Sequence, residues 1–171
     1  MSALVVVVGG LPGTGKSTVA EHAARLVGAA LLAKDVVEAT LWRSGIGREQ
    51  RSGWAGYELL GSLAEAQLTV GTSVVLDSVA AYERLRDGWR DLAARHGARF
   101  RAIECVCSDE QVHHGRIDGR QRGIPGWYEL TWQEVEDARS RYEPWLGEHL
   151  VLDAVVPLDR NLADLAAYLI P

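Results

Sequence analysis

Short apolar runs alternate along the chain with amphipathic stretches. Four valines in succession at 5–8 predict a strand of a parallel sheet that is covered on both faces. The helical spacing of the hydrophobic positions in residues 18–27 predicts a helix. The same strand-then-helix order recurs to the end of the chain, which favours an α/β fold: a doubly wound, five-stranded parallel sheet flanked by helices. The other four strands are predicted at 29–33, 73–77, 99–107 and 149–152.

The amphipathic stretches predict the helices and leave two irregular segments. Residues 43–56 are polar and glycine-rich, which predicts a mobile segment, and the Gly- and Pro-containing stretch 120–127 predicts the centre of a lid over about 116–130. Thr131 and Glu134 have capping-box spacing, whereas Asp35 and Ser108 are the expected caps of two other helices. After the first, the helices are expected at 35–42, 57–70, 82–96, 109–119, 131–142 and 161–169.

Composition and charge narrow the class of protein. The chain has 171 residues, 47% hydrophobic and 24% charged, which predicts one soluble domain over 1–171. Its net charge is −5, and Lys16 and Lys34 are its only lysines, which argues against general duplex nucleic-acid binding. No run suits a membrane span or a signal peptide. Cys105 and Cys107 are interpreted as apolar side chains of a strand that stay reduced. A cytoplasmic protein is therefore expected.

A phosphate-binding loop follows the first strand. Residues 10–17, GLPGTGKS, satisfy G-x-x-x-x-G-K-[ST] between a predicted strand and a predicted helix. Glycines let backbone N–H groups approach phosphate oxygens, and the helix directs its positive end toward them. Lys16 is expected to reach the β- and γ-phosphates of ATP and to act in catalysis. The expected ATP-contacting residues are Gly10, Leu11, Pro12, Gly13, Thr14, Gly15, Lys16, Ser17 and Thr18.

Two carboxylates follow strands of the same predicted sheet. Ligands of open parallel sheets bind at the carboxyl ends of the strands, where Asp35 and Asp77 are expected to lie near the phosphate loop. Asp77 and the Ser17 hydroxyl are the candidate Mg²⁺ ligands, and Asp35 is the candidate general base for an acceptor hydroxyl. Both aspartates are also expected to contact the substrate. The alternative for each is a helix cap.

Arginines and aromatic residues complete the candidate site. Arg120 and Arg122 in the lid are expected to close over the transferring phosphoryl group, and Arg116 is expected to contact ATP, although exposed arginine is common. A set of four residues that follow Asp35 in the chain are candidates for the wall of an acceptor pocket. The alternative is that the aromatic residues among them only pack against one another. The adjacent His113 and His114 are interpreted as exposed helix surface. The wall candidates are Trp42, Arg43, Trp54 and Tyr57.

With these residues placed, the chain resembles the small phosphate-loop kinases grouped with the polynucleotide-kinase and zeta-toxin-like ATPases, and also the chloramphenicol phosphotransferases. The likeness rests on residues 10–18, Asp35, the VVLD of 74–77, the arginines of 116–122 and the terminal helix after 152–153. The resemblance implies ATP, Mg²⁺, activation of the acceptor hydroxyl by Asp35, and lid arginines on the ATP phosphates. The segment 43–57 follows no acceptor signature of that group.

The function expected from these residues is a kinase that moves the γ-phosphate of ATP to a hydroxyl of a small molecule, such as a metabolite, a nucleoside-like compound or an antibiotic. Two alternatives stay open. A polynucleotide 5′-hydroxyl kinase would need a groove for the strand, and the acidic charge counts against it. A nucleotide-dependent switch with slow hydrolysis would leave Asp35 without a catalytic purpose.

Overall fold

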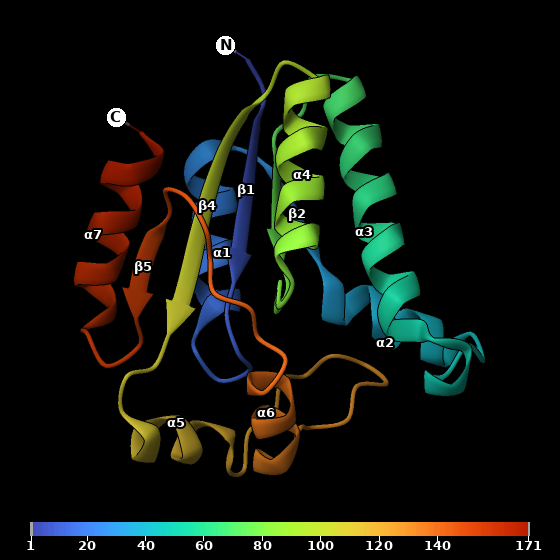
Figure 1. The fold of residues 1–171 in the computed structure, drawn as a ribbon, viewed down its shortest axis with the longest axis vertical. Helices are drawn as coiled ribbons and strands as arrows, with labels where there is room; N and C mark the ends of the chain where they lie inside the picture. Colours follow the sequence, from blue (N-terminus) through green and yellow to red (C-terminus); the bar gives the residue numbers. More distant parts are fainter. Residues whose placement is uncertain (1, 171) are drawn as a thin grey trace.

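Five parallel strands form the centre of the molecule. The computed structural model describes residues 2–170, and its sheet has the strand order β2-β3-β1-β4-β5 with every neighbouring pair parallel (Figure 1). This confirms the predicted five-stranded doubly wound α/β fold. The strands are β1 (Leu4–Gly9), β2 (Ala30–Ala33), β3 (Val74–Asp77), β4 (Arg99–Val106) and β5 (Leu150–Asp153).

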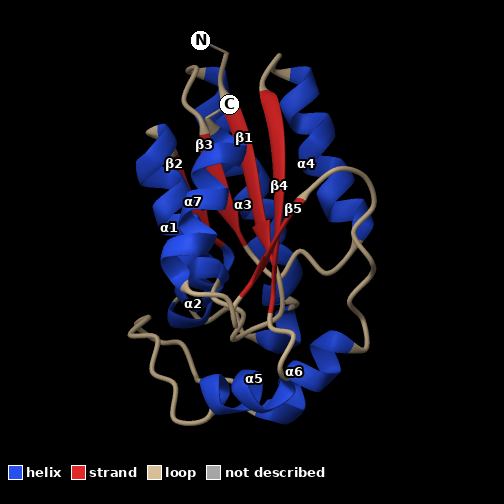
Figure 2. Ribbon diagram, turned by 90° about the vertical axis from the view of Figure 1, so that its left-hand side faces the viewer, coloured by secondary structure: helices blue, strands red, loops and turns tan. Residues whose placement is uncertain are grey.

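Helices cover both faces of the sheet, which explains the unbroken valine run. Val6 and Val8 belong to the core under α1 (Lys16–Val27) and α7 (Leu158–Leu169). Val5 and Val7 belong to the opposite core, under α3 (Ser52–Thr69) and α4 (Glu83–Arg95). Successive strand side chains point to opposite faces, so a central strand covered on both sides must be apolar at every position (Figure 2).

Three short helices lie at the carboxyl ends of the strands. In Figure 1 the arrowheads of β1, β4 and β5 point toward α5 (Glu110–Ile117) and α6 (Trp132–Arg139), and α2 (Lys34–Arg43) follows directly from the end of β2. The segment between α5 and α6 is the predicted lid. No helix within residues 2–170 is long and apolar enough to cross a membrane.

The irregular segment at 43–56 was predicted too long. A 3₁₀-helix, η1 (Arg48–Gln50), lies within it, and α3 begins at Ser52 rather than at Tyr57. Ser52 is fully buried, where its hydroxyl accepts a hydrogen bond from Trp42 Nε1 at 2.8 Å and donates to Glu38 Oε1 at 3.1 Å. These bonds to α2 are long-range contacts that the local glycine-rich composition did not reveal.

Two predicted helix caps were also wrong. Ala33 precedes α2, so Asp35 lies inside its first turn with its carboxylate free for another partner. Asp109, not Ser108, caps α5 by accepting a hydrogen bond from the Val112 amide at 3.0 Å. The Thr131–Glu134 capping box of α6 is confirmed. Several helix ends were misplaced by a few residues: α1 begins at Lys16, α5 ends at Ile117, α6 ends at Arg139 and α7 begins at Leu158.

Candidate functional site

The phosphate loop passes so close to β4 that only glycine fits at its first position. A Cβ on Gly10 would lie 2.2 Å from the Cys105 carbonyl oxygen, and φ of Gly10 is +142°. Gly13 and Gly15 also have positive φ, at +89° and +84°. Their backbone therefore bends as a tight cradle, and the loop ends at the N-terminus of α1, a geometry suited to anion binding.

We expect Gly10→Ala to lower the free energy of unfolding by about 3 kcal/mol or more, since overpacking adds to backbone strain. Gly28→Ala is the matched control, because Gly28 also has a positive φ but no heavy atom within 4 Å of a built Cβ. Gly28→Ala should lower the free energy of unfolding only by the backbone strain, about 1–2 kcal/mol. Denaturant unfolding measures both, and equal losses would contradict the close approach of Gly10 to Cys105.

One lysine and two carboxylates form a buried charged cluster next to the loop. Lys16 is 3% exposed; burial lowers its pKa, and the charges of Asp77 and Asp35 oppose that shift. Burial acts to raise the pKa of Asp35, but the charges of Lys16 and Arg122 outweigh it and hold that pKa below its ordinary value. Burial raises the pKa of Asp77 despite Lys16 and a hydrogen bond with Ser17. Opposed shifts in one cluster are typical of functional sites.

The carboxylate of Asp77 has the features of a Mg²⁺ ligand. Its Oδ1 atom is buried without a hydrogen-bond partner among the described residues, and Ser17 lies beside it. An unpartnered buried carboxylate oxygen next to a hydroxyl fits a hard cation. Residues 2–170 contain no cluster of three or more His, Cys, Asp or Glu side chains suited to a metal. Phosphate oxygens and water would therefore supply the remaining ligands of a Mg²⁺ ion held here.

Arg122 reaches from the lid into this cluster. Its Nη1 atom forms an ion pair with Asp35 Oδ2, and its Nη2 atom donates to Ser17 Oγ at 3.3 Å. Both side chains of the ion pair are largely buried, at 10% and 14% exposure. Arg120 lies nearby, where it lines a hollow of about 370 Å³ together with Arg122, Ser17 and Asp77. The structure thus brings both lid arginines to the carboxylates and the loop.

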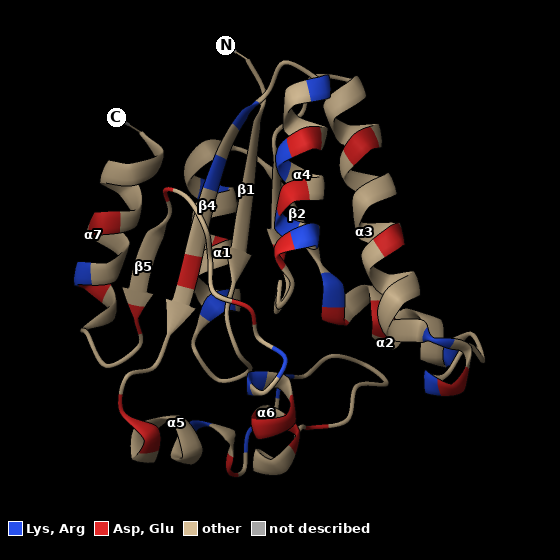
Figure 3. Ribbon diagram, in the orientation of Figure 1, with Lys and Arg blue, Asp and Glu red and all other residues tan. Residues whose placement is uncertain are grey.

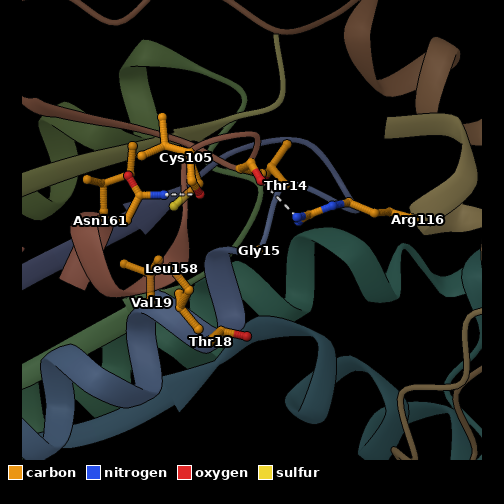
Figure 4. Close-up of a pocket in the computed structure, with 11 residues that line it drawn as sticks. Thr14, Gly15, Thr18, Val19, Cys105, Arg116, Leu158 and Asn161 are labelled. Carbon is orange, nitrogen blue, oxygen red and sulfur yellow. Dashed lines mark hydrogen bonds between the residues drawn. The ribbon is translucent and has the colours of Figure 1, made fainter. Parts of the chain in front are cut away.

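Arg116 lines a different hollow from this cluster. It lines a hollow of about 170 Å³ between the loop and the start of α7, and its Nη2 atom donates to the Ala154 carbonyl at 2.8 Å. Figure 4 labels residues around this hollow that come from the loop, α1, β4, α5 and α7: Thr14, Gly15, Thr18, Val19, Cys105, Arg116, Leu158 and Asn161.

A third hollow, of about 350 Å³, opens between α2 and the lid, and Asp35 and Pro12 both line it. We call it the acceptor-side hollow, after the pocket wall that the sequence predicted beside Asp35. Trp42 of α2 stacks on Trp127 of the lid, with ring centroids 5.0 Å apart and 15° between the planes. Arg48 lies 4.2 Å above the Tyr128 ring. The other lining residues are Lys34, Glu38, Val79, Leu130, Glu134, Asp137, Ala138 and Arg141.

Only part of the predicted pocket wall lines that hollow. Trp42 does, whereas Trp54 lies in a separate, open hollow beside Arg84, whose guanidinium is 4.4 Å from the Trp54 ring. Tyr57 packs against the sheet core, and Arg43 bonds to the Pro125 carbonyl of the lid. The sequence reasoning missed Trp127 and Tyr128, for which an adjacent aromatic pair after a Pro-Gly turn was the available signal.

Charged residues of both signs surround the site. Figure 3 shows Lys and Arg segments interspersed with Asp and Glu segments on α2, α4, α7 and the parts of the chain below the sheet. Several of these charges are paired: Lys34 with Glu38, and Arg48 with Glu134 at 3.4 Å. Such pairing leaves less free positive charge for a polyphosphate strand than the count of arginines suggests.

Comparison with known proteins agrees with this architecture. Residues 5–145 match the profile of a family described as AAA domain. A candidate kinase from Chloroflexus aurantiacus has 24% identity and a TM-score of 0.74, with 98% of each chain covered. A gluconokinase from Sinorhizobium meliloti has 20% identity and a TM-score of 0.70, covering 98% of this chain and 91% of that one. The APS kinase CysC from Mycobacterium tuberculosis, in complex with AMPPNP and APS, has 18% identity and a TM-score of 0.72, with 99% of each chain covered.

At these identities the solved structures show a shared fold, that of small P-loop kinases. The comparison with curated proteins found no match.

Proposed function

We propose that this chain, which belongs to the AAA domain family, transfers the γ-phosphate of ATP to a hydroxyl group of a small molecule. The observation that carries the proposal is the position of Asp35. Its carboxylate interacts with Lys16 and Arg122 on the phosphate side and also lines the acceptor-side hollow. A carboxylate between a phosphate site and a second pocket is placed to accept a proton from a hydroxyl that attacks the γ-phosphorus.

The proposed reaction is one displacement at phosphorus. The acceptor oxygen forms a bond to the γ-phosphorus, the bond from that phosphorus to the β–γ bridging oxygen breaks, and ADP leaves. Asp35 takes the hydroxyl proton; its low pKa keeps it ionised at neutral pH. Lys16 and the loop amides hold the phosphates. Bound between Ser17 and Asp77, Mg²⁺ would neutralise phosphate charge.

The lid arginines have a proposed place in the same step. Arg122 is bound to Asp35 and Ser17. When ATP is bound, the phosphate oxygens compete for its guanidinium, which frees Asp35 to contact the acceptor. Arg120 and Arg122 then stabilise the charge that spreads over the transferring group. The hollow beside Thr14, Gly15 and Arg116 is assigned to the nucleoside end of ATP, because it borders the loop and shares no lining residue with the acceptor-side hollow.

The test of this function is ADP formation with Mg²⁺ and ATP against a panel of small hydroxyl compounds, with short 5′-hydroxyl oligonucleotides included. We expect stimulation by a small compound and a product heavier by one phosphoryl group. Stimulation by oligonucleotides alone would favour a polynucleotide kinase. Hydrolysis stimulated only by a protein would favour the nucleotide-dependent switch.

The aromatic stack between α2 and the lid makes a separate prediction. We expect Trp127→Ala to raise the KM for the acceptor by about 2–12-fold, the range that corresponds to an aromatic pair worth about 0.5–1.5 kcal/mol. The KM for ATP should change little, since Trp127 lines a hollow that shares no residue with that of Arg116. Steady-state kinetics with each substrate varied in turn measures both constants.

Trp54→Ala is the comparison variant for Trp127→Ala. Trp54 was also a candidate for the acceptor wall, but it lines the separate hollow beside Arg84. A larger effect on acceptor KM from Trp54→Ala than from Trp127→Ala would contradict the assignment of the acceptor to the hollow between α2 and the lid.

A further inference from the structure

One buried histidine contacts the phosphate loop from outside. His113, on α5, was predicted to be exposed, but its side chain is 1% exposed, whereas its neighbour His114 is exposed. The correction has a physical reason: α5 packs on the loop through the helix face that carries His113 and Ile117. A Cβ built on Gly13 would lie 2.9 Å from Ile117 Cδ1 and 3.1 Å from His113 Cδ2.

The imidazole is held at both of its nitrogen atoms. Its Nε2 atom lies 2.7 Å from the carbonyl oxygen of Pro12, and its Nδ1 atom lies 3.4 Å from Arg139 Nη2 of α6. The Trp132 ring meets its ring edge-on, with 5.2 Å between the centroids and 88° between the planes. These contacts connect α5, α6 and the loop through one side chain.

The two partners determine which nitrogen carries the proton. A carbonyl oxygen can only accept a hydrogen bond, so Nε2 must be protonated to donate to Pro12. A guanidinium can only donate, so Nδ1 must be unprotonated to accept from Arg139. His113 is therefore neutral. Burial lowers its pKa, and the charges of Arg139 and Arg116 act in the same direction, against the hydrogen bond to Pro12 and the charge of Glu136.

The loop needs such an anchor because its amides must face an anion. The N–H groups of Gly13, Gly15 and Lys16 have no partner within residues 2–170. Their availability requires neighbouring carbonyls to point elsewhere and to be satisfied there. The Leu11 carbonyl accepts from the Thr14 hydroxyl at 2.8 Å, inside the loop. The Pro12 carbonyl instead accepts from His113, which is 101 positions away in the chain.

We propose that His113 is a positioning residue that holds the phosphate loop in its anion-binding conformation by donating a hydrogen bond to the Pro12 carbonyl. It touches neither the phosphates nor the acceptor and acts only through the loop. The identity of the anion as ATP rests on the proposed function, whereas the effect on the loop does not.

The test compares His113→Leu, His113→Gln and the control His114→Leu in the ligand-free protein and with ATP. Leucine removes the donor, while the amide nitrogen of glutamine can replace Nε2. His114 is exposed and contacts Asp118 at 3.1 Å, outside the loop. We expect His113→Leu to speed hydrogen exchange of the Thr14 amide, which donates to the Leu11 carbonyl at 3.4 Å inside the loop, by about tenfold and to raise the Kd for ATP by about tenfold. His113→Gln should recover most of both, and His114→Leu should match the wild type.

Unchanged loop exchange in a folded His113→Leu variant would overturn the proposal, as would equal losses in the leucine and glutamine variants. If the leucine variant does not fold, His113→Asn replaces it, because asparagine is polar but too short to place a donor at the position of Nε2. The protein could also show the expected changes in loop hydrogen exchange in the His113 variants and yet bind no ATP. That result would uphold the role of His113 and overturn the proposed function.

Discussion

Asp35→Asn is expected to lower kcat by about 10²–10⁴-fold, the contribution of a positioned general base. The asparagine amide occupies the same space but cannot accept the hydroxyl proton. Affinity for ATP should not fall, because Asp35 is not one of the loop residues and its charge competes with the phosphates for Arg122. Measurement of kcat by ADP release, together with the Kd for ATP by calorimetry, separates the two effects.

Asp137→Asn is the matched control for Asp35→Asn. Asp137 also lines the acceptor-side hollow, but it is an exposed carboxylate that accepts a hydrogen bond from Gln133 at 3.0 Å. The Asp137→Asn substitution should change the KM for the acceptor more than it changes kcat. A normal kcat in Asp35→Asn would show that Asp35 only positions Arg122, and the base would have to be sought elsewhere.

Lys16→Met is expected to lower kcat/KM for ATP by about 10²–10³-fold or more, the loss typical of one preorganised group that stabilises transition-state charge. Methionine retains much of the lysine stem, so the main change is the loss of the ammonium group. The same substitution should raise the pKa of Asp77 further, since the Lys16 charge opposes the effect of burial there. Kinetics with ATP varied measures the first effect.

The other lysine provides the comparison for Lys16→Met. Lys34 is paired with Glu38 and lies 5.2 Å from the centre of the Tyr57 ring, on the acceptor side. Lys34→Met should leave the Kd for ATP within about threefold of the wild type. Comparable losses of ATP affinity in the two variants would contradict a specific role of Lys16 on the phosphates.

The positions of the strands and of the phosphate loop could be predicted because their signals are local. The valine run of β1 requires cover on both faces, and the loop spacing between a strand and a helix has few other uses. The convergence of Asp35 and Asp77 on the loop followed from the geometry of parallel sheets. The structure places both beside Lys16, as their effects on its pKa indicate.

The parts that sequence did not predict depend on contacts between distant segments. The start of α3 is set by the bonds of Ser52 to Trp42 and Glu38, which no periodicity shows. The burial of His113 depends on a carbonyl 101 positions earlier in the chain. Local composition around both residues is polar, so a reading based on neighbours alone predicts exposed surface.

The central claim is that the γ-phosphate reaches a hydroxyl compound rather than water. The most direct measurement follows a labelled γ-phosphate of ATP in the presence of Mg²⁺ and the small hydroxyl compound that most stimulates ADP formation. We predict that the label appears in that compound in a one-to-one ratio with ADP, and that Asp35→Asn slows the transfer by about 10²–10⁴-fold. Label found only in inorganic phosphate, at the same rate with and without the compound, would contradict the account.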